Sequence, residues 1–200
     1  MSDPRTIGVY DAQAETYAKL TQADARHPTL EAFAEALPEG ARILDLGCGP
    51  GTAAGALAAR GFAVEAVDAS GEMVARAAQL PGVEARQAAF DDIAGVAVYD
   101  GVWANFSLLH AAKADFPRHL TAISKALKPA GVFHIGLKLG QGEARDRLGR
   151  HYAYYSETEL EGLLTGAGFQ PIQRTHGRDP GLDGAVSDWI TVLSKVNNDD

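Results

Sequence analysis

The sequence has a single cysteine and no long apolar segment, and both absences exclude classes of protein. Cys48 alone cannot form an internal disulfide framework or a zinc site built from several cysteines. No apolar run approaches the roughly 20 residues that a membrane-spanning helix needs. Residues 1–10 contain Asp3 and Arg5 and lack the apolar core of a secretion signal. We therefore expect a soluble, cytoplasmic protein without a membrane partner.

Clustered positive charge is missing as well. Lys and Arg number 18 against 26 Asp and Glu, which gives a net charge of −8. Because the phosphates of nucleic acids are bound by clustered cations, no nucleic-acid partner is expected. Hydrophobic residues make up 46% and charged residues 22% of the chain, which excludes a disordered protein. A length of 200 residues fits one domain of ordinary size.

The period of the apolar residues alternates between that of a strand and that of a helix. Strands are predicted at residues 42–46, 64–68, 83–87, 99–105, 132–137, 169–175 and 186–196. Helices are predicted at residues 10–20, 29–37, 52–60, 70–79, 115–127 and 156–167. This alternation predicts an α/β fold with a doubly wound, mostly parallel sheet and helices on both faces.

Residue types at the ends of these elements support their boundaries. Thr52, Ser70 and Ser156 are expected to cap three of the helices. Pro180-Gly181 and Asp183-Gly184 supply turn chemistry between the last two strands, which leaves no room for a helix there. These two strands are therefore expected to pair as a hairpin.

The segment Asp45-Leu46-Gly47-Cys48-Gly49-Pro50-Gly51-Thr52 is the most informative about function. It follows a strand and opens a helix, where a glycine-rich turn binds a ligand at the carboxyl edge of a sheet. Asp68 ends the next strand, where a carboxylate can accept both hydroxyls of a ribose. The alternative is a structural turn and a carboxylate that caps a helix. We expect a ligand that contains an adenosine-like ribose.

The spacing of the glycines indicates which nucleotide binds. A dinucleotide site has the spacing G-x-G-x-x-G and holds a pyrophosphate at the helix N-terminus, whereas this loop has G-x-G-x-G. Pro50 removes a backbone N–H that a phosphate would use, and Asp45 repels phosphate but suits an ammonium group. The ligand should be zwitterionic at one end, as S-adenosyl-L-methionine is. A nicotinamide oxidoreductase is the competing interpretation.

Four segments resemble motifs of the class I S-adenosylmethionine-dependent methyltransferases, in that family's order. They are residues 43–51, residues 64–70, Tyr99-Asp100-Gly101-Val102-Trp103 and Leu127-Lys128-Pro129-Ala130-Gly131-Val132. The chain also looks like small bacterial methyltransferases of type 11/12 or of the tellurite-resistance-like group. The resemblance implies a Rossmann-like sheet of seven strands whose last strand runs antiparallel between strands five and six. It implies a single domain, with covering helices in residues 1–40, the methyltransferase domain in 41–196 and a frayed tail in 197–200.

The resemblance also implies which residues hold the amino-acid and ribose parts of S-adenosylmethionine. The loop residues Gly47, Cys48 and Gly49, together with Asp45, would hold the amino-acid end, and Asp68 would hold the ribose.

The adenine end is less defined. Ala69 and Met73 would line its pocket, although Met73 as ordinary helix packing is an equal expectation. The position that often carries an acid for the adenine amino group is Ala89 here, so either Asp91 or only the backbone at Phe90 would take this role. Asn105, after the fourth strand, and Tyr17 would complete the cofactor site. For Tyr17, as for Tyr10, the alternative is an aromatic side chain that anchors its helix to the core.

Groups that act on the methyl acceptor should follow strands four and five. His110 is the first titratable group after strand four and either contacts the substrate or packs locally. Residues 140–155 have flanking glycines and are rich in Arg and Tyr, so they are expected to form a lid that brings Arg150, Tyr152 and Tyr155 to the acceptor. A solvated helix with Arg–Asp pairs is the alternative for this segment. His134 lies inside a strand and is expected to be structural.

Some acceptors are disfavoured. Asn105-Phe106-Ser107-Leu108 lacks the prolines typical of enzymes that methylate the amino groups of DNA bases, and Cys48 lies in the cofactor loop rather than at an acceptor. We expect methyl transfer to an O, N or S atom of a small molecule, without a metal, by a monomer or homodimer. The alternative is a catalytically silent protein that binds S-adenosylmethionine as a sensor or scaffold.

Overall fold

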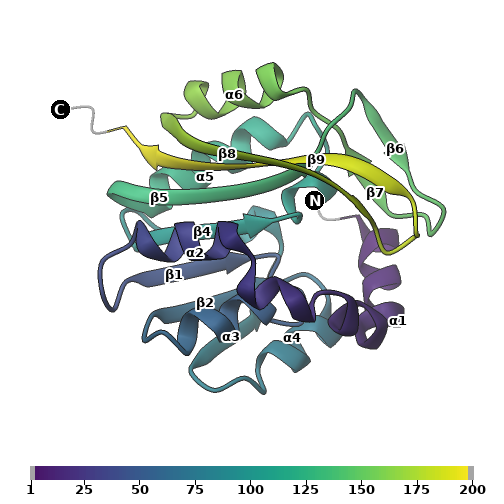
Figure 1. Cartoon of the computed structure of the whole chain (residues 1–200), viewed down its shortest axis with the longest axis horizontal. Coiled ribbons are helices and arrows are strands. Elements are labelled where there is room, and N and C mark those ends of the chain that lie inside the picture. Colours follow the sequence, from purple (N-terminus) through teal and green to yellow (C-terminus); the bar gives the residue numbers. More distant parts are fainter. Residues whose placement is uncertain (1–2, 198–200) are drawn as a thin grey trace.

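A computed structural model describes residues 3–197 and shows helices packed on both faces of a central sheet (Figure 1). The sheet has seven strands in the order β3-β2-β1-β4-β5-β9-β8. The strands are β1 (Arg42–Leu46), β2 (Ala63–Asp68), β3 (Val83–Gln87), β4 (Tyr99–Asn105), β5 (Leu127–Lys138), β8 (Phe169–Pro180) and β9 (Val186–Val196). Strands β1 to β5 pair in parallel, and β9 runs antiparallel between β5 and β8. The expected fold class is therefore confirmed.

The helices form two layers because the strands bury side chains on both faces. The helices are α1 (Pro4–Leu20), α2 (Pro28–Glu35), α3 (Thr52–Ala58), α4 (Gly71–Ala77), α5 (Phe116–Ala126) and α6 (Glu157–Gly166). Successive residues of a strand point to opposite faces. Leu44 accordingly joins the core that contains α5 and α6, whereas Ile43 joins the core that contains α2 and α3.

Two of the expected helix caps are confirmed and one is wrong. Ser70 Oγ accepts a hydrogen bond from the Met73 N–H, and Ser156 does the same at the start of α6. Thr52 is not a cap: Gly51 takes that position with a φ of 85°, and no side chain caps α3. A glycine is favoured there because the left-handed conformation is strained for residues with a Cβ atom.

Residues 140–155 do not form the solvated helix considered above. They contain a small hairpin of β6 (Glu143–Arg145) and β7 (His151–Ala153). The last two strands form the expected hairpin, but β8 extends to Pro180 rather than ending at residue 175. Of the tail expected to be frayed, residues 198–200 lie outside the described part of the chain.

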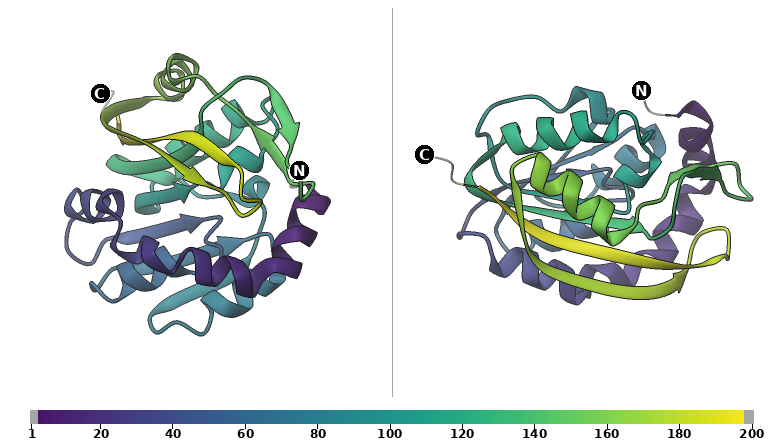
Figure 2. Two further views of the ribbon diagram at one scale, coloured as in Figure 1. Left: turned by 45° about the vertical axis from the view of Figure 1, so that its right-hand side comes forward. Right: turned by 90° about the horizontal axis from the view of Figure 1, so that it is seen from above.

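The features that surround the site gather at the carboxyl edge of the parallel strands. Both views in Figure 2 place α1 beside this edge, close to the β6–β7 hairpin. The tip of the β8–β9 hairpin reaches the same side of the molecule (Figure 1). Gly47 and Gly49, in the loop between β1 and α3, line the same cavities as Tyr10 and Tyr17 of α1, and the larger of these cavities is also lined by Trp189 of β9.

Candidate active site

The loop after β1 is held tightly against its neighbours. The N–H groups of Gly47 and Cys48 both donate to the Val67 carbonyl, at 2.8 and 2.9 Å. Gly47 has a φ of 73°, and a Cβ atom placed on it would lie 2.3 Å from Cβ of Ser107. Ser107 cannot easily give way, because its Oγ donates to the Leu46 carbonyl at 2.6 Å. A side chain at position 47 would therefore disrupt the loop.

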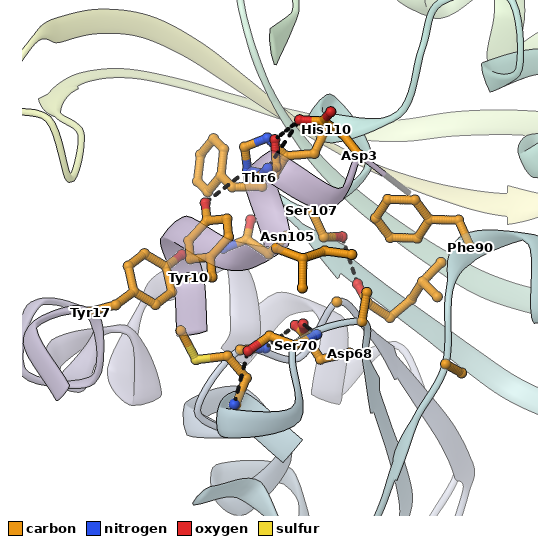
Figure 3. A pocket seen from close by; sticks show the side chains of 18 residues that line it. Asp3, Thr6, Tyr10, Tyr17, Asp68, Ser70, Phe90, Asn105, Ser107 and His110 are labelled. Atoms are coloured by element: carbon orange, nitrogen blue, oxygen red, sulfur yellow. Dashed lines mark hydrogen bonds between the residues drawn. The ribbon is translucent and has the colours of Figure 1, made fainter. Parts of the chain in front are cut away.

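Asp68 ends β2 with its carboxylate fixed by two backbone groups. Gly49 N–H donates to one carboxylate oxygen and Ser70 N–H to the other, each at 2.9 Å. Burial raises the pKa of Asp68 despite these hydrogen bonds. Ala69 and Met73 lie beside it in a cavity of about 70 Å³, whose labelled side chains are seen in Figure 3. A carboxylate oxygen can accept more than one hydrogen bond, so Asp68 retains acceptor capacity for a ligand.

Asp45 lies below the glycine loop and is 2% exposed. Its Oδ2 atom has no hydrogen-bond partner among the described residues. Burial, followed by repulsion from Asp68, raises the pKa of Asp45 to about 7. A buried carboxylate oxygen without a partner is costly unless a cation or donor reaches it. The site therefore fits a ligand whose ammonium group approaches the loop.

A second, larger cavity of about 400 Å³ adjoins the first. Both cavities are lined by Tyr10, Tyr17, Gly47, Gly49, Asn105 and Phe106. Asp68 and Phe90 line only the smaller cavity, whereas Asp45, Trp103 and Trp189 line only the larger one. The site thus has two compartments that meet above the glycine loop.

His110 is part of a series of hydrogen bonds that runs through Tyr10 to Arg150. Its Nδ1 lies 2.6 Å from the His151 carbonyl, so this nitrogen must carry the proton and donate. Its Nε2 lies 2.8 Å from the Tyr10 hydroxyl, which therefore donates to it (Figure 3). Burial lowers the pKa of His110 to about 3. The ring is neutral, and both of its nitrogens are bound within the protein.

Arg150 continues this chain from the β6–β7 hairpin. Its Nη1 donates to the Tyr10 hydroxyl at 2.9 Å, and its Nε donates to Asp146 at 2.8 Å. The Asp146 carboxylate neutralises the guanidinium group, and both side chains are almost completely buried. The Arg150 guanidinium also lies 5.2 Å from the ring centre of Tyr152. Arg150 and Tyr152 form part of the wall of the larger cavity.

The structure brings together most of the residues singled out in the sequence. The smaller cavity is lined by Tyr17, Gly47, Gly49, Asp68, Ala69, Met73, Phe90, Asn105 and His110. The larger one is lined by Tyr17, Asp45, Gly47, Cys48, Gly49, Asn105, Arg150 and Tyr152.

Two of the expected residues lie outside both cavities. Tyr155 is 1% exposed and packs in the core, with its ring centre 4.7 Å from that of Phe116. Asp91 lies at the surface, where its carboxylate accepts from Arg118 at 2.6 Å. Phe90, its neighbour, does line the smaller cavity. Of the two residues considered for the adenine, Phe90 thus lines the smaller cavity, whereas the Asp91 carboxylate lies outside it and is bound to Arg118.

Other lining residues were not predicted from the sequence. Lys138, at the end of β5, and Trp189, in β9, are paired across these antiparallel strands. Phe106 has a φ of 53°, which is unusual for a bulky residue, and it lines both compartments. The position of Phe106 directly after a parallel strand is a signal that sequence reasoning could have used. The approach of Lys138 and Trp189 depends on strand register, which has no local signal.

Neither a metal-binding cluster nor a membrane-spanning helix is found among the described residues. Among residues 3–197, no group of three or more His, Cys, Asp or Glu side chains is arranged to hold a metal ion. No helix in the same part of the chain has both the length and the apolar character needed to cross a membrane.

Comparison with known proteins identifies the family. Residues 17–174 match a family described as a methyltransferase domain. Trans-aconitate 2-methyltransferase of Azoarcus sp. (strain BH72) is 36% identical over 175 residues, which cover 82% of this chain. The match spans only 65% of the length of that curated relative.

Solved structures agree with the fold. One is the 1,6-didemethyltoxoflavin-N1-methyltransferase of Burkholderia thailandensis with bound 1,6-didemethyltoxoflavin and S-adenosylhomocysteine. It has 22% identity and a TM-score of 0.69, and the match covers 96% of this chain and 88% of that one. The DhpI–SAH complex has 21% identity and a TM-score of 0.72, with coverage of 98% and 97%. The chain belongs to the class I S-adenosylmethionine-dependent methyltransferase family.

Proposed function

We propose that this protein transfers the methyl group of S-adenosylmethionine to an O, N or S atom of a small-molecule acceptor. The observation that carries the proposal is the pair of joined compartments. One contains the ribose-binding type of carboxylate, Asp68, and the other contains the unpartnered carboxylate oxygen of Asp45. The relative and the neighbour reported above are named for small acceptors, trans-aconitate and 1,6-didemethyltoxoflavin, which supports an acceptor of this size.

The smaller compartment is assigned to the adenosine part. Asp68 would accept the ribose hydroxyls, and Ala69 and Met73 would contact the adenine. The backbone at Phe90 takes the adenine-binding role in this proposal, because the Asp91 carboxylate is directed to Arg118.

The amino-acid part is assigned to the glycine loop. Its ammonium group would supply the partner that Asp45 Oδ2 lacks, while the absence of side chains at Gly47 and Gly49 lets the ligand lie against the backbone. Pro50 and the two nearby carboxylates are unsuited to a diphosphate. The rest of the larger compartment then remains for the acceptor.

The acceptor atom is the nucleophile in this displacement, and S-adenosylmethionine, when bound, would supply a methyl group already activated on a sulfonium, with S-adenosylhomocysteine as the leaving group. The protein has to align the acceptor and exclude water. Tyr10 and Tyr17 of α1 lie where the compartments meet, with ring centres 5.2 Å apart, and close the junction from above. His110 fixes Tyr10 through its acceptor Nε2, so we assign it a positioning role rather than that of a general base.

The test combines binding and turnover. Calorimetric titration with S-adenosylhomocysteine should show binding. The fluorescence of NADH, in contrast, should not change when the protein is added. Methyl-labelled S-adenosylmethionine should then transfer label to a member of a metabolite panel, and Tyr152→Ala in the wall of the larger compartment should reduce this transfer. Binding of the cofactor without turnover on any acceptor would instead support a silent sensor or scaffold. Binding of NADH in its place would contradict the proposal.

A further inference from the structure

The larger compartment contains an ammonium group that forms no direct ion pair with any residue among 3–197. Lys138 ends β5 and is only partly exposed. Within residues 3–197, its Nζ forms no hydrogen bond and has no carboxylate within 4.0 Å, the distance of a direct ion pair. Its contact is the ring of Tyr152, whose centre lies 4.5 Å from Nζ. Burial lowers the pKa of Lys138, and the negative charges of Asp183 and Asp146 oppose this effect only in part.

The other charged side chains of this compartment have partners or an assigned role. Arg150 is neutralised by Asp146. Asp179 accepts from Nε1 of Trp189 at 2.8 Å. In the proposed function, Asp45 binds the ammonium group of the cofactor. Lys138 is therefore the cation that remains for an acceptor.

The surroundings of Lys138 suit a flat molecule. Lys138 and Trp189 are direct cross-strand neighbours, so their side chains lie on the same face of the sheet. The Trp189 ring lies edge to face with Phe106, at 5.8 Å, and with His27, at 6.2 Å, between ring centres. A small planar group can pack against these rings with one polar end directed to the ammonium group.

We propose that the methyl acceptor carries a carboxylate and that Lys138 binds this group, with the unsaturated body of the acceptor against Trp189 and Phe106. This inference rests on the proposed function, which places the acceptor in this compartment. Lys138 selects the acceptor by charge and takes no part in the displacement at the methyl group.

A carboxylate fits this charge arrangement better than a phosphate does. One unpaired ammonium group matches one negative charge. Asp45 and Asp179 lie in the same lining and would repel a phosphate dianion. The guanidinium group that could have added a second positive charge is already paired with Asp146.

The experiment compares three probes of one shape, benzoate, benzamide and phenyl phosphate, by ligand-observed NMR on protein saturated with S-adenosylhomocysteine. Benzoate should bind about tenfold more tightly than benzamide, as expected for one charge-assisted contact. In Lys138→Met this ratio should fall to about one, and in Lys138→Arg it should be retained. Lys195→Met, at the exposed far end of β9, is the matched control and should keep the wild-type ratio.

Several outcomes would overturn the assignment. These are equal binding of benzoate and benzamide, an unchanged ratio in Lys138→Met, tighter binding of phenyl phosphate, and no binding of any probe. The proposed function is tested separately by the affinity for S-adenosylhomocysteine, which Lys138→Met should leave unchanged. If S-adenosylhomocysteine does not bind, the proposed function fails, and the same three titrations on the protein alone still decide whether Lys138 selects a carboxylate.

Discussion

Nε2 of His134 lies 3.1 Å from Oδ1 of Asn105, so a buried histidine on β5 holds the side-chain amide at the end of β4. The His134 ring stacks on Trp103 with ring centres 3.7 Å apart. Burial lowers the pKa of His134 to about 3, which keeps the ring neutral. The amide oxygen is thereby occupied, and the N–H groups of Asn105 are left for a ligand at the junction of the two compartments.

Replacing His134 with leucine should leave the Asn105 oxygen without its donor. We expect His134→Leu to lower the free energy of unfolding by about 1–3 kcal/mol, the usual cost of an unpaired buried polar group. Urea denaturation measures this change. In a double-mutant cycle with Asn105→Ala, the two effects should couple by at least about 0.5 kcal/mol. Strictly additive effects would show that the hydrogen bond contributes nothing.

Asp68→Ala should weaken the binding of S-adenosylhomocysteine by about 1–3 kcal/mol, because ribose hydroxyls and two backbone N–H groups lose their acceptor. Calorimetry measures the dissociation constant. Asp91→Ala is the matched control and should leave this constant unchanged, since its carboxylate is bound to Arg118 at the surface. A loss of affinity in Asp91→Ala would indicate that the Asp91 side chain binds the adenine. An unchanged dissociation constant in Asp68→Ala would contradict the assignment of Asp68 to the ribose.

Cofactor binding should depend on the protonation of Asp45. With a pKa of about 7 in the free protein, Asp45 is ionised above this pH and protonated below it. An ammonium group binds the ionised form, so the dissociation constant for S-adenosylhomocysteine should rise as pH falls, by up to about tenfold per pH unit below 7. Titrations between pH 5.5 and 7.5 in about half-unit steps test this. Asp45→Asn should bind more weakly and with a flatter pH profile.

The same group should affect stability with a definite sign. Because the folded-state pKa of Asp45 is raised, the stability it contributes is fully present below its unfolded pKa of 3.8 and is lost as pH rises to about 7. Relative to the wild type, Asp45→Asn should therefore gain stability over this range, by up to about 4 kcal/mol for a pKa that rises from 3.8 to about 7 on folding. Urea denaturation at pH 4 and at pH 8 gives this difference. A gain that is larger at the acidic end would contradict the raised pKa.

The local parts of the fold and the glycine-rich loop could be predicted from the sequence. The strand at residues 42–46, the G-x-G-x-G loop and Asp68 form one continuous β-loop-α-β unit, whose geometry follows from nearby residues. Alternating burial and glycines with positive φ leave a strong pattern in such a unit. The same reasoning failed at Thr52, because the loop needs a left-handed residue at the cap position and Gly51 supplies it.

The larger cavity was harder to predict from the sequence, because segments that are distant along the chain form its lining. Tyr152 and Tyr155 are close in sequence and similar in chemistry, yet Tyr152, within β7, lines the larger cavity, whereas Tyr155, after that strand, packs against Phe116 in the core. Strands of three residues leave too short a pattern to reveal the β6–β7 hairpin. The pairing of Lys138 with Trp189 depends on the register of two strands about 50 residues apart, and register is a tertiary property.

His110 should not titrate near neutral pH. Its pKa is lowered to about 3 by burial, and its Nδ1 proton is held by the His151 carbonyl. We expect its ring resonances to remain constant between pH 5 and 8 and to show the Nδ1–H tautomer in nitrogen-detected NMR, with His110→Gln used to assign them. The pH profile of methyl transfer should keep its shape in Tyr10→Phe. Movement of these resonances in that range would restore His110 as a candidate base.

The helix over the cofactor site should act as a cover that is latched by the β6–β7 hairpin. Arg145 donates two hydrogen bonds to the Asp3 carboxylate, at 2.8 and 3.0 Å, and His151 N–H donates to Thr6 Oγ1 at 2.9 Å. Arg145→Ala should speed the release of S-adenosylhomocysteine in stopped-flow measurements. The increase should be modest, about two- to fivefold, because the pair is partly exposed and such pairs contribute up to about 1 kcal/mol.

The control for this latch lies on the same helix. Among residues 3–197, the ion pair of Lys19 is with Glu15 in the same helix, so Lys19→Ala alters an exposed ion pair without touching the hairpin and should leave the release rate unchanged. Thr6→Val removes the second contact, and in combination with Arg145→Ala it should increase the rate beyond either single variant. If Arg145→Ala and Lys19→Ala release the ligand equally fast, α1 opens without breaking its contacts with the hairpin, and the ligand leaves by another route.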